Sequence, residues 1–195
     1  MRNEGVAKPE SYRSGGLGVG VIGLALAAVA LAFGVLDPDA GFAPWAYPLI
    51  VFLAAVSWAV LVRPALRLHS EEVELRNILH TRWVPLASIT SVDIGQVTVV
   101  RVGEERYAGS GFGRTRRTIR RDGRASDDTP LQDRSLAWIV EDRIRHRAAA
   151  ARERAGLSGL SGADERPGEV RRVWAWPEIV TVGGSAVATL VLMLR

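Results

Sequence analysis

The sequence predicts a membrane protein of the α+β class. Its expected parts are a transmembrane helical hairpin, a small antiparallel β-barrel or sheet with a C-terminal amphipathic helix, and a C-terminal transmembrane helix. Three observations support this prediction: two long uncharged apolar segments near the N-terminus, a series of short alternating segments in the middle, and a third apolar segment at the C-terminus. About 20 apolar residues are needed to cross the roughly 30 Å hydrocarbon core of a bilayer.

The first two apolar segments, residues 17–36 and 45–62, contain no charged side chain. Such segments are apolar on every face, unlike the one-sided helices of soluble domains. Between them, residues 37–44 form a short turn with two prolines and the acidic Asp37 and Asp39. The alternative for the first segment is a cleaved signal peptide. Its length exceeds the 7–15 residues typical of a signal-peptide core, and a second apolar segment follows. We therefore expect a transmembrane hairpin.

The distribution of basic residues predicts the orientation of this hairpin. Residues 1–16 contain three basic side chains, the turn at 37–44 contains none, and Arg63 and Arg67 follow the second segment. Cytoplasmic loops of membrane proteins are enriched in Lys and Arg. We expect a multi-pass protein of a bacterial cell inner membrane, with a disordered cytoplasmic N-terminus at 1–16 and a cytoplasmic central domain. The bacterial origin rests on composition alone, since Arg almost completely replaces Lys in a chain rich in Ala and Gly.

The central region, residues 63–155, begins with segments in which apolar and polar residues alternate, as on a strand with one buried face. Turn residues separate these segments at hairpin spacing, which is typical of a small antiparallel sheet or barrel. The expected strands are 66–69, 73–76, 81–85, 86–94, 96–102 and 106–108.

An Arg-rich loop at 113–130 and an amphipathic helix at 134–155 complete the predicted domain. The apolar stripe of the helix is expected to comprise Leu136, Ile139, Val140 and Ile144, with Asp133 or Ser135 as its cap. A flexible linker at 156–172 follows.

The third transmembrane helix is expected at 173–194. A half-inserted or interfacial segment is the alternative, because the continuous apolar part is short. Small residues in this segment are expected to form a packing face against the hairpin: Gly183, Gly184, Ser185 and Ala188.

Val62-Arg63-Pro64 at the end of the hairpin, the segment Val73–Pro85 (VELRNILHTRWVP) and Ile89–Val92 together resemble the short bacterial pleckstrin-homology (PH-like) domains. In many small bacterial membrane proteins these domains follow two N-terminal membrane spans. The similarity covers roughly residues 17–112. It implies a strongly bent antiparallel sheet closed by a helix, a role that residues 136–154 would fill, and it implies no catalytic residues. The long Arg-rich loop and the third apolar segment depart from this plan, so the strands after Tyr107 stay unassigned.

The sequence predicts no catalytic site, metal site or cofactor, and no small-molecule substrate is evident. The chain has no Cys, which excludes disulfides and Cys-ligated metals. Its three histidines lack metal-ligand spacing, although His69 and His80 could face each other across a hairpin. Gly18, Gly20 and Gly23 spell G-x-G-x-x-G, but no strand precedes them, as a dinucleotide site would require. The pairs Gly16/Gly20 and Gly23/Ala27, each four residues apart, instead indicate close packing of helices.

The candidate site is the arginine cluster of the loop: Arg114, Arg116, Arg117, Arg120, Arg121 and Arg124. Basic clusters are attracted to anionic lipid headgroups, and guanidinium groups bind phosphate bidentately. The expected function is a non-enzymatic interaction or scaffolding role, with anionic lipid or an acidic protein as the partner of this loop. A solvated loop without a ligand is one alternative. The other is a membrane-tethered nucleic-acid-binding protein, which is disfavoured because aromatic residues are not interleaved with the arginines.

Overall fold

The computed structural model of the protein describes residues 9–13, 15–37, 39, 41–123, 134–157 and 168–195. The chain forms two compact units. The α+β unit comprises residues 1–14, 64–77 and 81–173, and the helical unit comprises residues 15–63, 78–80 and 174–195. The predicted α+β class with antiparallel sheets is confirmed, and two helices are apolar enough and long enough to cross a membrane.

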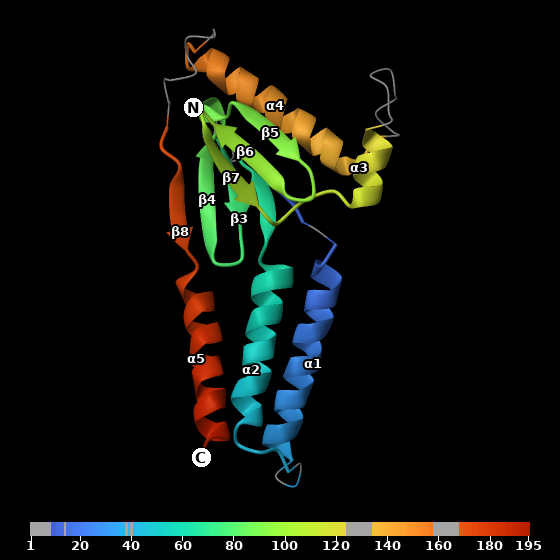
Figure 1. The fold of residues 1–195 in the computed structure, drawn as a ribbon, viewed down its shortest axis with the longest axis vertical. Coiled ribbons are helices and arrows are strands. Elements are labelled where there is room, and N and C mark those ends of the chain that lie inside the picture. The colour runs from blue at the N-terminus through green and yellow to red at the C-terminus, as the bar shows by residue number, and fades with distance from the viewer. Residues whose placement is uncertain (1–8, 14, 38, 40, 124–133, 158–167) are drawn as a thin grey trace, which may run out of the picture. The chain divides into compact units, whose positions relative to one another are not determined.

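The helical unit consists of three apolar segments in which α2 packs against both α1 and α5. Figure 1 shows α1 and α5 running in one direction and α2 running back between them. A π-helix, η2, continues α2, and Arg63 closes it by donating its backbone N–H to the carbonyl of Trp58 at 2.8 Å. The bounds are α1 Leu17–Leu36, α2 Ala46–Ser57, η2 Trp58–Val62 and α5 Trp176–Met193.

Glycines allow α1 to approach α2 and η2 closely, as expected from the sequence. A Cβ atom at Gly20 would lie 2.7 Å from Val62 Cγ2, and one at Gly23 would lie 3.0 Å from Ser57 Oγ. The corresponding prediction for Gly183 and Gly184 is wrong, since a Cβ atom at either position would meet nothing within 4 Å. Ser185 of the predicted face is buried, and the helical rotation of α5 also buries Thr189, four residues further on.

The apolar helices leave most of their own surface uncovered. Only 11% of the apolar window of α1 and 6% of that of α5 is buried. The segment Ala46–Val62, formed by α2 and η2, is also apolar but shorter than these two helices. A core helix of a soluble protein would bury its apolar side chains against the rest of the fold.

The α+β unit contains two sheets. The five-stranded sheet has the order β1-β2-β3-β4-β8, and the three-stranded sheet has the order β5-β6-β7. The pairs from β1 to β4 and from β5 to β7 are antiparallel. The bounds are β1 Glu10–Tyr12, β2 Ala65–Leu68, β3 Glu72–Arg76, β4 His80–Pro85, β5 Ser91–Ile94, β6 Thr98–Val102, β7 Glu105–Gly109 and β8 Arg171–Trp174.

Three sequence predictions about these strands need correction. Within the N-terminal segment 1–16, which was expected to be disordered, Glu10–Tyr12 form a strand in which Ser11 pairs with Arg67 of β2; residues 1–8 lie outside the described part of the chain. The strand expected at 86–94 is interrupted by a 3-10 turn at Leu86–Ser88. Residues assigned to the linker and the third helix form β8, and α5 begins only at Trp176, where Pro177 in the first turn suits a helix start.

The two sheets lie against each other without forming one closed barrel in the described part of the chain. Asn77, just after β3, connects them: its side-chain amide donates to the carbonyl of Ala108 at 3.0 Å and accepts from the backbone N–H of Ser110 at 2.8 Å. Gly111 lies so close to the backbone of Ala65 that no side chain fits there. The sheets therefore meet where β7 and the following turn cross β2 and β3.

Helix α4, Leu136–Arg154, covers the core of this unit. Ser135 caps it by accepting from the backbone N–H of Trp138 at 3.2 Å, as one of the two predicted caps. The buried stripe is shifted from the expected one, because Leu136 is 60% exposed. Small residues on the same face allow the helix to approach the sheets closely; the buried apolar residues of α4 are Ala137, Val140, Ile144, Ala148 and Ala151.

Candidate functional site

The arginine-rich segment contains a short helix, α3 (Arg116–Asp122), where the sequence predicted a loop at 113–130. Thr115 caps this helix by accepting from the backbone N–H of Thr118 at 3.3 Å. Arg has a high helix propensity, and Arg120 and Arg121 lie in the last turn, where positive charge is favourable to the helix dipole. The loop prediction is therefore wrong at these seven residues.

Arg114, which we expected to be part of the ligand-binding cluster, is used inside the fold. Its side chain is only 12% exposed, its Nη2 lies 2.6 Å from Oε2 of Glu141, and its Nε lies 3.6 Å from Oδ2 of Asp122. A guanidinium group held by two carboxylates is committed to the fold, because removing it from them would leave buried charges without compensation. Arg114 therefore anchors α3 and does not belong to its exposed surface.

Glu141 of α4 is the buried centre of this anchor. The residue is 7% exposed, and its carboxylate also accepts from the backbone N–H of Ile94 at 3.3 Å and from Arg145 at 2.5 Å. At the other end of α3, the hydroxyl of Ser135 donates to Asp122. Both ends of α3 are thus attached to α4, so the helix has a defined position on the α+β unit.

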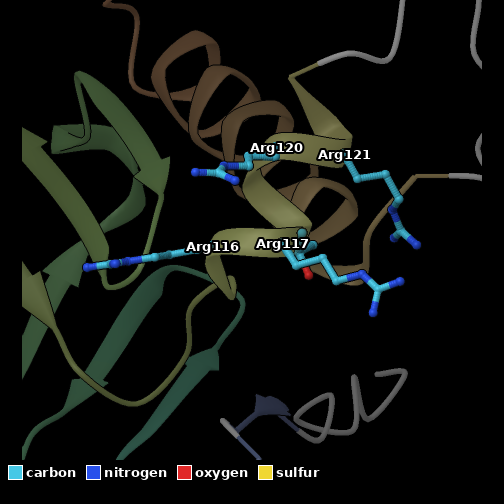
Figure 2. A pocket seen from close by; sticks show the side chains of 5 residues that line it. Arg116, Arg117, Arg120 and Arg121 are labelled. Carbon is cyan, nitrogen blue, oxygen red and sulfur yellow. The ribbon is translucent and has the colours of Figure 1, made fainter.

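The remaining described arginines of the cluster, Arg116, Arg117, Arg120 and Arg121, are exposed. Figure 2 shows Arg116 and Arg120 extending to one side of α3 and Arg117 and Arg121 to the other. These four side chains and Thr118 line a hollow of about 600 Å³. Arg121 is 4.0 Å from Asp122. No ion pair with another described residue is present for the other three. Arg124 lies outside the described residues.

This arrangement concentrates positive charge: among the described residues, the one carboxylate within ion-pair distance of these four arginines is that of Asp122, 4.0 Å from Arg121. Residues four apart on a helix are neighbours, so Arg116/Arg120 and Arg117/Arg121 are like-charged pairs that each cost a few tenths of a kcal/mol. An anion placed between the members of a pair removes this repulsion and accepts charge-assisted hydrogen bonds from the guanidinium forks. The surface is therefore suited to several separate anionic groups.

The other titratable residues singled out in the sequence do not form a chemical site. His69 lies 3.1 Å from Glu74, and its ring is tilted against that of Trp83, whereas His80 lies near the ring of Trp174. The prediction that the two histidines face each other is therefore wrong. Among the described residues there is no group of three or more side chains that could hold a metal ion.

A buried ion pair in the helical unit was missed by the sequence analysis. Nε of Arg63 lies 2.8 Å from Oε1 of Glu178, and their side chains are 5% and 18% exposed. The pair attaches the first turn of α5 to the end of η2. Arg63 is followed by Pro64, and Glu178 is preceded by Pro177, so each charged residue lies beside a proline at the end of an apolar segment. This shared position is the sequence signal from which the ion pair could have been predicted.

Comparisons of the chain with protein-family models, with curated proteins and with solved structures find no significant match.

Proposed function

We propose that the chain is a non-enzymatic, multi-pass membrane protein that binds anionic lipid headgroups through the exposed arginines of α3. In this proposal α1, α2 with η2, and α5 cross the bilayer, and the α+β unit is a cytoplasmic PH-like interaction domain. The observation that carries the binding site is the set of four exposed guanidinium groups on a helix whose two ends are attached to α4.

Support for the membrane location comes from the apolar surface of the helical unit. Large side chains such as Val19, Phe33, Val180 and Leu190 are more than half exposed. Exposed apolar area of this extent is costly in water, and lipid removes that cost. The basic residues that flank the helices, set against the acidic turn at 37–44, support a cytoplasmic location of the α+β unit.

Support for lipid as the ligand comes from the spacing of the arginines. The two i, i+4 pairs extend in different directions, so they favour an array of anions over one small molecule. Each basic residue close to an anionic membrane surface contributes about 1 kcal/mol. Four such residues would give roughly 4 kcal/mol, enough to hold a tethered domain against the surface.

The chain offers a direct test, because it contains no Cys and one engineered Cys is therefore a unique reporter. Gly123 is exposed and has a φ of −70°, so Gly123→Cys places a label just after α3 without backbone strain. The full chain would be reconstituted in neutral or in anionic vesicles, and immersion of an environment-sensitive fluorophore would be measured. We expect a blue shift in anionic vesicles that disappears at about 1 M salt, where the Debye length is about 3 Å.

Two double variants with the same change in charge provide the control. Arg117→Gln with Arg121→Gln removes one i, i+4 pair of α3 and is expected to abolish most of the shift. Arg101→Gln with Arg106→Gln removes an exposed cross-strand pair on β6 and β7 and is expected to preserve it. An unchanged shift in the α3 variant would refute the proposal. Salt-sensitive binding of DNA or RNA without any lipid response would favour the nucleic-acid alternative.

A further inference from the structure

A groove of about 390 Å³ lies along α2 in the helical unit, with α1 on one side and α5 on the other. Its floor is formed by Val51, Ala54 and Ala55 of α2, and Leu24 and Thr181 contribute to its walls. The small side chains at Ala54 and Ala55 create the hollow, because a larger residue at either position would fill the space between the flanking helices.

One end of this groove is polar. Trp58 and Glu178 line it there, and Glu178 forms the 2.8 Å ion pair with the buried Arg63. Val51 and Trp58 are seven positions apart, so the apolar floor extends for about 10 Å from the polar end. An apolar channel with a charged group and an aromatic ring at one end matches an amphiphile and not a fully apolar molecule.

We infer that this groove binds one acyl chain of a lipid whose headgroup carries an ammonium group. The inference rests on the proposed function, since it requires the helical unit to lie in a bilayer. The acyl chain lies on Ala54 and Ala55, and the ammonium group lies at the polar end, against the ring of Trp58 and the carboxylate of Glu178. A cation over an indole ring is attracted by its π electrons, and the attraction is larger where water is excluded.

The electrostatics of the ion pair favour a zwitterionic headgroup. Arg63 and Glu178 together carry no net charge, and of the two side chains Glu178 is the more exposed. A purely anionic headgroup would place an additional negative charge beside Glu178 in a medium of low dielectric constant, where like charges repel strongly. A headgroup with both an ammonium and a phosphate group adds no net charge, and its ammonium donates to the carboxylate, which has four acceptor positions.

The test uses the full-length chain in nanodiscs that contain phosphatidylethanolamine and phosphatidylglycerol in equal amounts. The phosphatidylethanolamine carries a photoreactive group in its acyl chain, and the crosslinked peptides are identified by mass spectrometry. We expect crosslinks concentrated on α2 around Ala54 and Ala55. We also expect native mass spectrometry to show retained phosphatidylethanolamine exceeding retained phosphatidylglycerol by roughly tenfold.

One variant that fills the groove and one matched control test whether the groove holds the lipid. Ala55→Phe fills the floor and is expected to abolish both the crosslinks and the retained lipid. Val187→Phe adds the same ring to the exposed face of α5 and is expected to change neither. Because Ala55→Phe can disturb folding, the wild-type chain provides a test that does not depend on this variant. Crosslinks spread evenly over the apolar faces of α1 and α5, or equal retention of the two lipids by the wild-type chain, would overturn the inference.

The failure of this inference is distinguishable from the failure of the proposed function. If alkaline carbonate extracts the chain from membranes, the membrane proposal itself is wrong. If the chain stays in the membrane and the Gly123→Cys reporter still responds to anionic lipid, an even crosslinking pattern disproves lipid binding in the groove and leaves the proposed function standing.

Discussion

Nη2 of Arg114 lies 2.6 Å from Oε2 of Glu141, and this contact joins the arginine-rich helix α3 to the core helix α4. The carboxylate is almost completely buried, and it also accepts from the backbone N–H of Ile94 and from Arg145. The position of the exposed arginines of α3 thus depends on the buried carboxylate of Glu141.

Glu141→Gln is expected to release α3 from α4. Removing one partner of a buried ion pair costs about 3 kcal/mol or more, because it leaves the other charge without compensation. We expect a roughly hundredfold loss of amide hydrogen-exchange protection at residues 116–122. Asp142→Asn changes the charge of the next residue, whose side chain is 41% exposed, and serves as the control. Undiminished protection in Glu141→Gln would show that α3 is held by other contacts.

Gly20→Ala is expected to weaken the packing of α1 on η2. Its Cβ would lie 2.7 Å from Val62 Cγ2 and 2.8 Å from Leu61 Cβ, so the helices must move apart at a cost of about 1–3 kcal/mol. Gly18→Ala adds the same methyl group two residues away, where nothing lies within 4 Å, and is expected to be neutral or slightly stabilising. Thermal unfolding in detergent measures both variants, and equal melting temperatures would contradict the prediction.

Strand β1 is expected to detach at acidic pH. Hydrogen bonds from Tyr12 and then from Arg143 hold the pKa of Glu10 below its ordinary value of 4.5. Because the folded state favours the ionised carboxylate, this contribution to stability is fully present above about pH 4.5 and is lost as the pH falls through the lowered pKa. The anisotropy of a label on Ser11→Cys, an exposed position, is therefore expected to decrease below pH 4.5.

Two further variants test the assignment of this transition to Glu10. Glu10→Gln is expected to lower the anisotropy at every pH and to remove the acid transition. Glu104→Gln, in an exposed turn, is expected to leave the transition unchanged. A transition that persists in Glu10→Gln would assign it to another group.

The proposed topology predicts opposite accessibility of two engineered cysteines. Asp39→Cys lies in the turn between α1 and α2, and Glu104→Cys lies in the turn between β6 and β7; both positions are exposed. We expect a membrane-impermeant maleimide added to intact cells to label position 39 and not position 104. Labelling of position 104 before lysis would refute the cytoplasmic location of the α+β unit.

The parts of the fold that local patterns specify could be predicted from the sequence. Charged or turn residues border the apolar segment of α1, which has the expected bounds of Leu17–Leu36. Strict alternation marked strands such as β3, and a run of β-branched residues between turn residues marked β6. Strand β1 could not be found in this way, because three residues are too few for a period, and its conformation depends on Arg143 and Arg147, far away in the chain.

The candidate site was predicted as a set of arginines, and the sequence could not separate its members. Arg114 and Arg116 are the same residue type two positions apart, but the side chain of Arg114 is only 12% exposed and pairs with Glu141, whereas Arg116 is exposed. Only the partner on α4 distinguishes them. The pairing of Arg63 with Glu178 was hidden for the same reason, since more than 100 positions separate them.

The π-helix η2 also determines which way Arg63 points. Its closing hydrogen bond spans five residues, from the N–H of Arg63 to the carbonyl of Trp58, and not the four of an α-helix. Each residue of a helix turns the chain by about 100°. Deleting one residue between Trp58 and Val62 would therefore rotate the guanidinium group away from Glu178. The number of residues in η2 thus sets the rotational position at which the second apolar helix can pair with the third.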